Sequence, residues 1–246
     1  MKKITLFLFA LLISCSAWGD VKGGEYFFFK PNAGTWGSSN AWFCAYFWKD
    51  GGSSTNIIKL ERWGNTDHYY CKTTGSETYN RVIILRKSPN TTKLDWDTDT
   101  WNKSNDLTLT NNYIINTGWN ANNFDNSKKI SMAVLGSMNN WADDVMAFNG
   151  TEFSKTYTYE TLTSDSYEFK VRNNNDWNWS YGHSSFDSDS DIKTTGSDNA
   201  KINLSDLSKV FHSIKFYLNN NWKIGVKVTY VNYDNLYIKS DKFIIQ

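Results

Sequence analysis

Aromatic rings and amides gather in one stretch of the sequence, residues 167–182. Trp177, Trp179 and Tyr181 are alternate residues, and alternate side chains project to the same side of an extended segment. The four residues before Trp177 are three asparagines and an aspartate, which favour a turn. A pyranose stacks its apolar face on aromatic rings, and its hydroxyls hydrogen-bond to amides and carboxylates. The stretch therefore predicts a sugar-binding site beside a turn.

Within this site we expect Trp177 and Trp179 to form a platform for the sugar and Asn175 to hydrogen-bond it. A second turn rich in asparagine precedes Trp141, which adds a third ring to the predicted site. The alternative is that these tryptophans fill the core of the fold, where large aromatic side chains are also common. Truncating a platform ring would weaken binding, whereas truncating a core ring would lower stability.

The elements that hold this stretch are predicted to be strands. Apolar and charged residues alternate over 167–172, which is typical of a strand with one buried face. A strand is also expected to begin at Ile130, and alternation predicts further strands at 213–218, 223–230 and 236–245, with a short helical turn at 206–211. These strands are enough to close a β-sandwich over 129–246.

The first half of the chain also predicts strands. Residues 25–109 are rich in β-branched and aromatic residues and contain no periodic run of helix length. The expected strands are 26–30, 41–48, 57–62, 68–73, 82–86 and 106–109. Their number and spacing are typical of a β-sandwich, here over 22–112. The asparagine-rich segment 113–128 is expected to be a linker, and the long segment 87–105 a functional loop.

Composition and charge favour a neutral ligand. The 246 residues are 17% aromatic, and 26 basic residues balance 25 acidic residues to a net charge of +1. Such a chain has no long-range field to attract nucleic acid or an anionic membrane. We therefore expect no nucleic acid among its partners.

The N-terminus predicts export. Lys2 and Lys3 precede an apolar run over 4–13 and then small residues, which is the pattern of a signal peptide over 1–19. Cleavage is expected either before Asp20 or at a lipobox that makes Cys15 the lipidated first residue. No later run is long enough to span a membrane. The expected location is extracellular or on the outer-membrane surface.

Little in the sequence predicts catalysis or a cofactor. Beyond the signal peptide, Cys44 and Cys71 permit one disulfide. The three histidines, His68, His183 and His212, are scattered and are interpreted as ordinary polar residues.

Two ladders of alternate aspartates, over 95–99 and 187–191, have the spacing of calcium ligands. Both lack the glycine and the glutamate that a calcium loop needs, so solvated turns are expected there. We predict no metal, no cofactor and no catalytic residue.

The first predicted sandwich resembles a known family. The strings YFFFKPNAGTW, AWFCAYFW, RVIILRK and WDTDTWNKSNDLTL occur in order. They resemble the starch-binding modules of carbohydrate-binding families twenty-five and twenty-six, in the form found in surface proteins of Bacteroides relatives. The resemblance implies a sandwich with an aromatic platform for α-glucans, to which Tyr26 and Trp36 would contribute.

The second predicted sandwich carries a weaker resemblance. Its strings ISMAVLGSMNNW and YEFKVRNNNDWNWSYG are similar to the immunoglobulin-like starch-binding domains of outer-membrane starch-utilisation lipoproteins. Together, the residues and resemblances predict an all-β chain: two immunoglobulin-like β-sandwich modules after a signal peptide. The expected function is non-catalytic binding of starch-like α-glucans. The alternative is an extracellular adhesion or envelope structural protein without a glycan ligand.

Overall fold

The computed structural model describes residues 20–52, 54–158, 160–204 and 211–230. Strands, turns and two short 3-10 segments, η1 (Ser137–Asn139) and η2 (His183–Ser185), make up these ranges, which confirms the all-β prediction. Cys15, the strand expected at 236–245 and nearly all of the helical turn expected at 206–211 lie outside the described residues. Within those residues no helix has the length and apolar character needed to cross a membrane.

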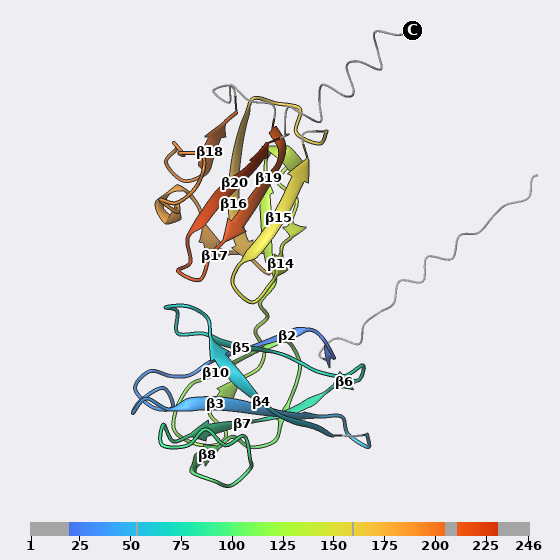
Figure 1. Ribbon diagram of the computed structural model, residues 1–246, viewed down its shortest axis with the longest axis vertical. Coiled ribbons are helices and arrows are strands. Elements are labelled where there is room, and N and C mark those ends of the chain that lie inside the picture. The colour runs from blue at the N-terminus through green and yellow to red at the C-terminus, as the bar shows by residue number, and fades with distance from the viewer. Residues whose placement is uncertain (1–19, 53, 159, 205–210, 231–246) are drawn as a thin grey trace, which may run out of the picture.

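The sheets form two bodies, one above the other in Figure 1. The first, here the N-terminal body, holds a two-stranded and a nine-stranded sheet. The pair is β1 (Val21–Lys22) and β6 (Thr78–Tyr79), and the larger sheet runs β11 (Phe124–Asp125), β10 (Tyr113–Asn116), β2 (Tyr26–Lys30), β5 (Tyr69–Lys72), β4 (Ser54–Arg62), β3 (Trp42–Trp48), β7 (Arg81–Lys87) and β8 (Thr100–Lys103), with β9 (Leu107–Thr108) also on β7.

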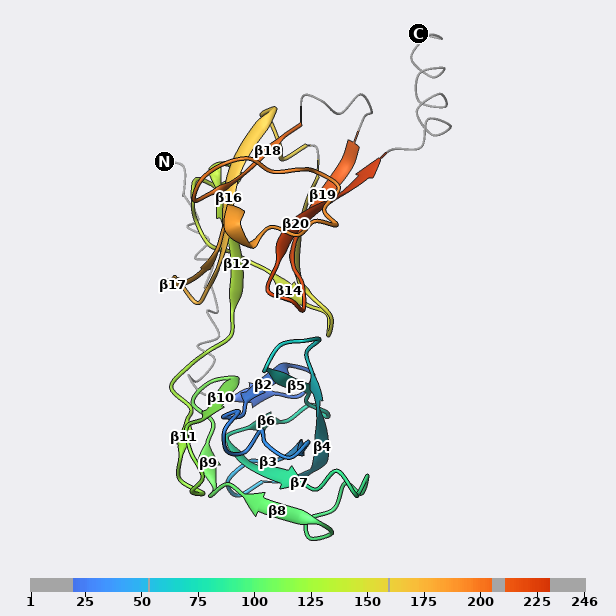
Figure 2. The same ribbon diagram turned by 90° about the vertical axis from the view of Figure 1, so that its left-hand side faces the viewer.

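The second, the C-terminal body, has two sheets that face each other (Figure 2). One runs β13 (Asp144–Val145), β12 (Met132–Gly136), β16 (Ser166–Asn173) and β17 (Asp176–Tyr181), with β18 (Ala200–Asn203) also on β16; the other runs β14 (Ala147–Phe148), β15 (Phe153–Thr158), β19 (Phe211–Leu218) and β20 (Ile224–Tyr230). Phe169 of β16 and Phe216 of β19 make an edge-to-face contact, with ring centroids 4.8 Å apart. The core therefore lies between the sheets.

Strand β2 shows how alternation divides the aromatic residues of the N-terminal body. Phe27 and Phe29 point into the core, where their rings contact Phe47 and Phe43, both at 5.1 Å between centroids. Phe28 projects from the opposite side of the strand, as the period of two requires. There it meets Phe148 and Phe153 of the C-terminal body. One face of β2 thus fills a core and the other forms an interface.

The expected linker at 113–128 contains two strands. Tyr113 and Ile114 are buried, and β10 pairs in parallel with β2 through Tyr113 opposite Phe28 and Ile114 opposite Phe29. The short apolar run over 113–115 is enough for a strand because neighbouring side chains bury it. Strand β11 adds a further pair at residues 124–125. Most of this segment therefore belongs to the N-terminal body.

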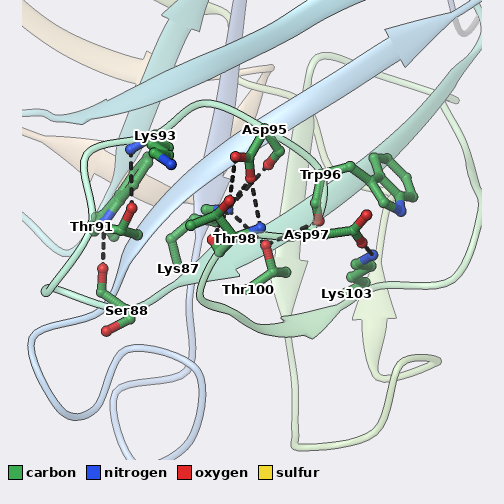
Figure 3. A network of polar contacts seen from close by, with 11 residues as sticks. Lys87, Ser88, Thr91, Lys93, Asp95, Trp96, Asp97, Thr98, Thr100 and Lys103 are labelled. Atoms are coloured by element: carbon green, nitrogen blue, oxygen red, sulfur yellow. Dashed lines mark hydrogen bonds and ion pairs between the residues drawn. The ribbon is translucent and has the colours of Figure 1, made fainter.

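The long segment 87–105 wraps around a buried ammonium group (Figure 3). Lys87 is fully buried, and its Nζ lies 2.5 Å from Thr98 O, 2.7 Å from Thr100 Oγ1 and 3.1 Å from Asp95 O. The carboxylate of Asp95 lies 3.4 Å from the same nitrogen and accepts hydrogen bonds from the backbone and side chain of Thr98. The first aspartate ladder is therefore not merely a solvated turn: it encloses Lys87.

The second aspartate ladder ties its loop to neighbouring strands. Asp187 accepts hydrogen bonds from Tyr217 Oη at 2.8 Å and Asn219 Nδ2 at 2.9 Å. Asp191 accepts one from the backbone N–H of Val228. Protein donors thus use carboxylate oxygens of both ladders.

Within the described residues, Cys44 and Cys71 are both free and buried. Burial raises the pKa of the Cys44 thiol to about 12, against the smaller opposing effect of the Lys87 ammonium, and burial also raises the pKa of Cys71.

A disulfide reagent reacts with the thiolate form of cysteine, so we expect neither thiol of the folded chain beginning at Asp20 to react with Ellman's reagent at neutral pH. Both should react in denaturant. Fast reaction before unfolding, or none after it, would contradict this assignment.

The two bodies share one apolar cluster. Phe28, Trp63 and Tyr113 of the N-terminal body belong to the same core as Met146 and Phe153 of the C-terminal body. An apolar interface of this kind opposes relative movement of two bodies. Side chains from both sides can therefore build a single, well-defined site.

Candidate carbohydrate site

Trp177 and Trp179, which were predicted to share one platform, both lie in the hairpin of β16 and β17 but face different surroundings. Arg172 pairs with Ser180, whereas Asn173 pairs with Asp176, so the intervening residues of β17 bulge out of register. A bulge redirects side chains because the strand no longer alternates regularly. Trp177 and Trp179 consequently have different neighbours, and the shared platform predicted for them is wrong.

Trp177 lies on the outer side of the hairpin. Its ring is 54% exposed, and the Arg172 guanidinium carbon lies 4.3 Å from the ring centroid. Arg172 is buried and donates a hydrogen bond from Nε to Asp143 Oδ1 at 2.7 Å. One face of the Trp177 ring is therefore occupied by a cation of the protein itself.

Trp179 faces the junction of the two bodies. Its Nε1 donates a 2.7 Å hydrogen bond to Tyr181 Oη, and its ring lies 5.9 Å from the ring of Trp222. The rings of Tyr181 and Trp222 stack nearly parallel, with centroids 5.6 Å apart. Trp222 sits in a turn with φ of 58°, a left-handed backbone conformation. The C-terminal body thus contributes three packed aromatic rings.

The N-terminal body supplies rings from the other side. His68 is buried, and its Nε2 lies 2.8 Å from Tyr113 Oη. Its ring lies 5.1 Å from Trp222 across the junction, and Tyr113 lies 6.2 Å from Trp179. The interpretation of His68 as an ordinary polar histidine is therefore wrong, because the aromatic packing encloses it.

These rings border a cleft of about 470 Å³ between the bodies. Its lining is aromatic with a charged rim: Lys30, Asp67, His68, Tyr113, Ile115, Lys128, Asp176, Trp179, Tyr181 and Trp222. The volume is in the range of small-molecule sites, which are mostly apolar with a few polar groups that fix the ligand. Two lysines balance two aspartates on the rim, so the cleft suits an uncharged ligand.

Asp67 is held in its charged form. Its Oδ1 lies 2.8 Å from His68 Nδ1, a close contact that falls short of hydrogen-bond alignment, and its Oδ2 lies 2.8 Å from Lys30 Nζ. The pKa of Asp67 is well below its usual value, chiefly through the interaction with His68 and with help from Lys30, against the opposing effect of burial. Asp67 is thus an acceptor at neutral pH.

The phenols of the cleft stay protonated. Burial raises the pKa of both Tyr113 and Tyr181, and the negative charge of Asp67 raises both further, while the hydrogen bond from Trp179 opposes the rise at Tyr181. A protonated phenol can both donate and accept a hydrogen bond. The cleft therefore offers flat rings together with neutral hydroxyls.

Two aromatic residues assigned by resemblance lie elsewhere. Trp36 is fully buried in the N-terminal core, where Nε1 donates to Trp119 O at 3.2 Å, so its prediction as a ligand platform is wrong. Tyr26 is half-buried at the interface, with its ring 4.8 Å from Phe148 and the ammonium of Lys72 over it. Neither borders the cleft.

The remaining predicted residues are on the surface. Trp141 is exposed, and its N–H bonds to Gly136 O at the end of β12 that lies opposite Phe169. The Arg172 guanidinium that lies against the Trp177 ring bonds to Asp143, which follows Trp141 by two residues. Asn175 is exposed in the hairpin turn, with φ of 60°. The expected grouping of Trp141 with Trp177 and Asn175 stays a prediction.

Sequence reasoning missed His68, Tyr113 and Trp222. A signal for Trp222 was present, because it follows three asparagines just as Trp177 follows an asparagine-rich turn. No such local signal marks the other two residues. Each belongs to an ordinary strand region, and only packing against the other body makes it part of the cleft.

A second and larger cavity, about 1260 Å³, also lies along the junction. It shares no lining residue with the cleft and is bordered by Tyr26, Phe28 and Phe148. These rings contact one another at the interface. The cleft is the better candidate because its rings converge with paired charges in a smaller space.

No protein-family model, no curated protein and no solved structure matches this chain.

Proposed function

We propose that the protein is a non-catalytic carbohydrate-binding protein, with starch-like α-glucans as its ligand class, and that the cleft between the bodies binds the sugar. The observation that carries this proposal is the convergence of Trp179, Tyr181 and Trp222 with His68 and Tyr113 around one space. Aromatic faces stack on the apolar face of a sugar ring. The neighbouring phenols, carboxylates and ammonium groups supply donors and acceptors for its hydroxyls.

Asp67 is suited to accept hydrogen bonds from a sugar and not to act as the proton donor of a hydrolase. A glycoside hydrolase needs a carboxylic acid with a raised pKa to protonate the leaving oxygen. Burial does oppose ionisation of Asp67, but its contacts with His68 and Lys30 outweigh that effect and lower its pKa. In the proposed cleft Asp67 accepts hydrogen bonds from hydroxyls and donates no proton.

The sequence resemblances enter the proposal as further support. We infer two immunoglobulin-like β-sandwich modules, exported behind a signal peptide to the cell exterior or outer-membrane surface, with Cys15 as the residue for a lipid anchor. The facing sheets of the C-terminal body agree with the sandwich part of this inference. A glycan array and retention of the chain beginning at Asp20 on insoluble amylose test the ligand class.

The two tryptophans of β17 make a matched pair for testing the cleft. Trp179→Ala removes a ring that borders it and is expected to weaken maltoheptaose binding by about 1 to 3 kcal/mol through lost stacking and apolar contact. Trp177→Ala removes a ring on the outer side and should leave affinity unchanged. Calorimetric titration of both variants measures the difference, and thermal melts check that each is folded.

The results of these experiments distinguish the proposed functions from one another. Equal affinity of folded Trp179→Ala and wild type would overturn the cleft as the sugar site. Failure of the wild type to bind any glycan would instead favour the adhesion or structural protein. Release of reducing sugar from the polysaccharide would contradict the non-catalytic assignment.

A further inference from the structure

Two exposed tryptophans lie on the N-terminal body away from the cleft. Trp101 of β8 is 42% exposed and Trp119, in the turn after β10, is 52% exposed. In Figure 1 strand β8 is at the end of the N-terminal body that is farthest from the C-terminal body. A single exposed ring is ordinary on a protein surface, whereas two exposed rings held together on one surface are a candidate contact for a ligand.

A buried guanidinium holds both rings. The guanidinium carbon of Arg86 lies 4.7 Å from the ring centroid of Trp101 and 5.5 Å from that of Trp119. The Arg86 side chain is itself fixed: Nε donates to Trp36 O at 2.6 Å, Nη2 to Ser38 O at 2.9 Å and Nη1 to Asn102 Oδ1 at 3.2 Å. The rings are therefore positioned before any ligand arrives, which lowers the entropic cost of binding.

The loops that carry the rings are tied to each other. The N–H of Asn105 donates to Ala121 O at 2.9 Å, and the side chains of Asn105 and Asn122 also hydrogen-bond. The backbone oxygen of Trp119 accepts from the indole of Trp36. Trp101 and Trp119 thus belong to one braced surface, here called the tryptophan platform.

The chemistry around the platform selects an uncharged, hydroxyl-rich ligand. Its exposed polar neighbours Asn105, Asn120 and Asn122 carry neutral amides. The hydrogen bonds of Arg86 go to protein oxygens, and its charge lies against both rings. A second cation over these rings would be repelled, so a basic partner is disfavoured. Stacking rings among amides fit a neutral polysaccharide chain.

We propose that Trp101 and Trp119 form a second glycan-binding site that engages the same polysaccharide as the cleft. This inference rests on the proposed function for its ligand class, but it concerns a different surface and different residues. Two sites at separate places on one molecule raise retention on an insoluble polymer through effective concentration, without changing the affinity of either site for a short oligosaccharide.

The test is protection of tryptophans from oxidation, read residue by residue by mass spectrometry, with maltoheptaose and, separately, cellohexaose as probes. In the wild type we expect at least one probe to protect Trp101, Trp119 and Trp179, while Trp141 serves as an exposed tryptophan outside both sites. In Trp179→Ala, protection of Trp101 and Trp119 should persist.

On insoluble amylose, Trp101→Ala/Trp119→Ala should reduce retention roughly tenfold or more, whereas Trp119→Phe, which keeps a stacking ring, should reduce it much less.

Each pattern of protection decides between the two sites. Protection of Trp179 without Trp101 and Trp119 overturns the platform and leaves the cleft intact. Protection of Trp101 and Trp119 without Trp179 supports the platform and overturns the cleft. No protection at any of the three overturns both. If the double variant melts at a lower temperature than the wild type, its loss of retention supports the platform only when a probe also protects Trp101 and Trp119 of the wild type from oxidation.

Discussion

Trp63→Ala is expected to destabilise the protein by about 3 to 5 kcal/mol, the usual cost of truncating a buried tryptophan. Trp63 is almost fully buried where the bodies meet, and its ring centroid lies 4.5 Å from that of Trp222 and 5.5 Å from that of Phe153. Its Nε1 also donates a 2.7 Å hydrogen bond to Thr151 O. The substitution would leave a cavity in the shared core and remove the donor that bonds the Thr151 carbonyl.

The consequences of Trp63→Ala should extend to cooperativity and binding. Because one apolar cluster joins the bodies, the wild type is expected to unfold in a single transition in urea, and the variant in two. Sugar binding at the cleft should weaken as well, since the ring of Trp63 packs against that of Trp222. Trp177→Ala is the matched control: its exposed ring should cost about 1 kcal/mol or less. Equal stability losses in the two variants would contradict the shared core.

Lys87→Met should destabilise the protein by about 2 to 4 kcal/mol, because it keeps the apolar stem of the side chain but removes the ammonium group. The oxygens that face it, from Asp95, Thr98 and Thr100, would lose their common donor inside the fold. Urea denaturation measures the loss. Hydrogen exchange should show the amides of residues 95–100 opening faster in the variant, because the loop is organised around that charge.

Lys103→Met is the matched control for Lys87→Met. It lies in the same segment, its ammonium pairs with the exposed Asp97 at 3.1 Å, and it covers the ring of Trp96. An ion pair open to solvent contributes about 1 kcal/mol at most. If both methionine variants lost the same stability, burial of Lys87 would not be what holds the loop.

Local pattern determined much of the fold. The strands expected at 26–30, 57–62 and 213–218 all lie within observed strands. They were predictable because apolar and polar residues alternate at consecutive positions, which indicates alternating buried and exposed side chains. The strand at 113–116 was missed because its apolar run is short and is stabilised by β2, which lies far away in the sequence.

The candidate site was predictable only in kind. Aromatic residues beside asparagine-rich turns indicated sugar chemistry, and Trp179 does border the cleft. Local pattern also placed Trp177 on the surface correctly, but it could not reveal the bulge that turns this ring away from Trp179. A register shift depends on both strands of a pair and not on one segment alone.

Consecutive residues were enough to predict an all-β chain, rich in aromatic rings, with turns suited to a neutral polar ligand. Which rings meet depends on the three-dimensional packing, which buries Trp36, exposes Trp101 and Trp119 over Arg86, and brings His68 against Trp222. The physical reason is that each of these outcomes depends on packing between segments distant in the chain. Periodicity reports which side of a strand a residue occupies, but not what lies across from it.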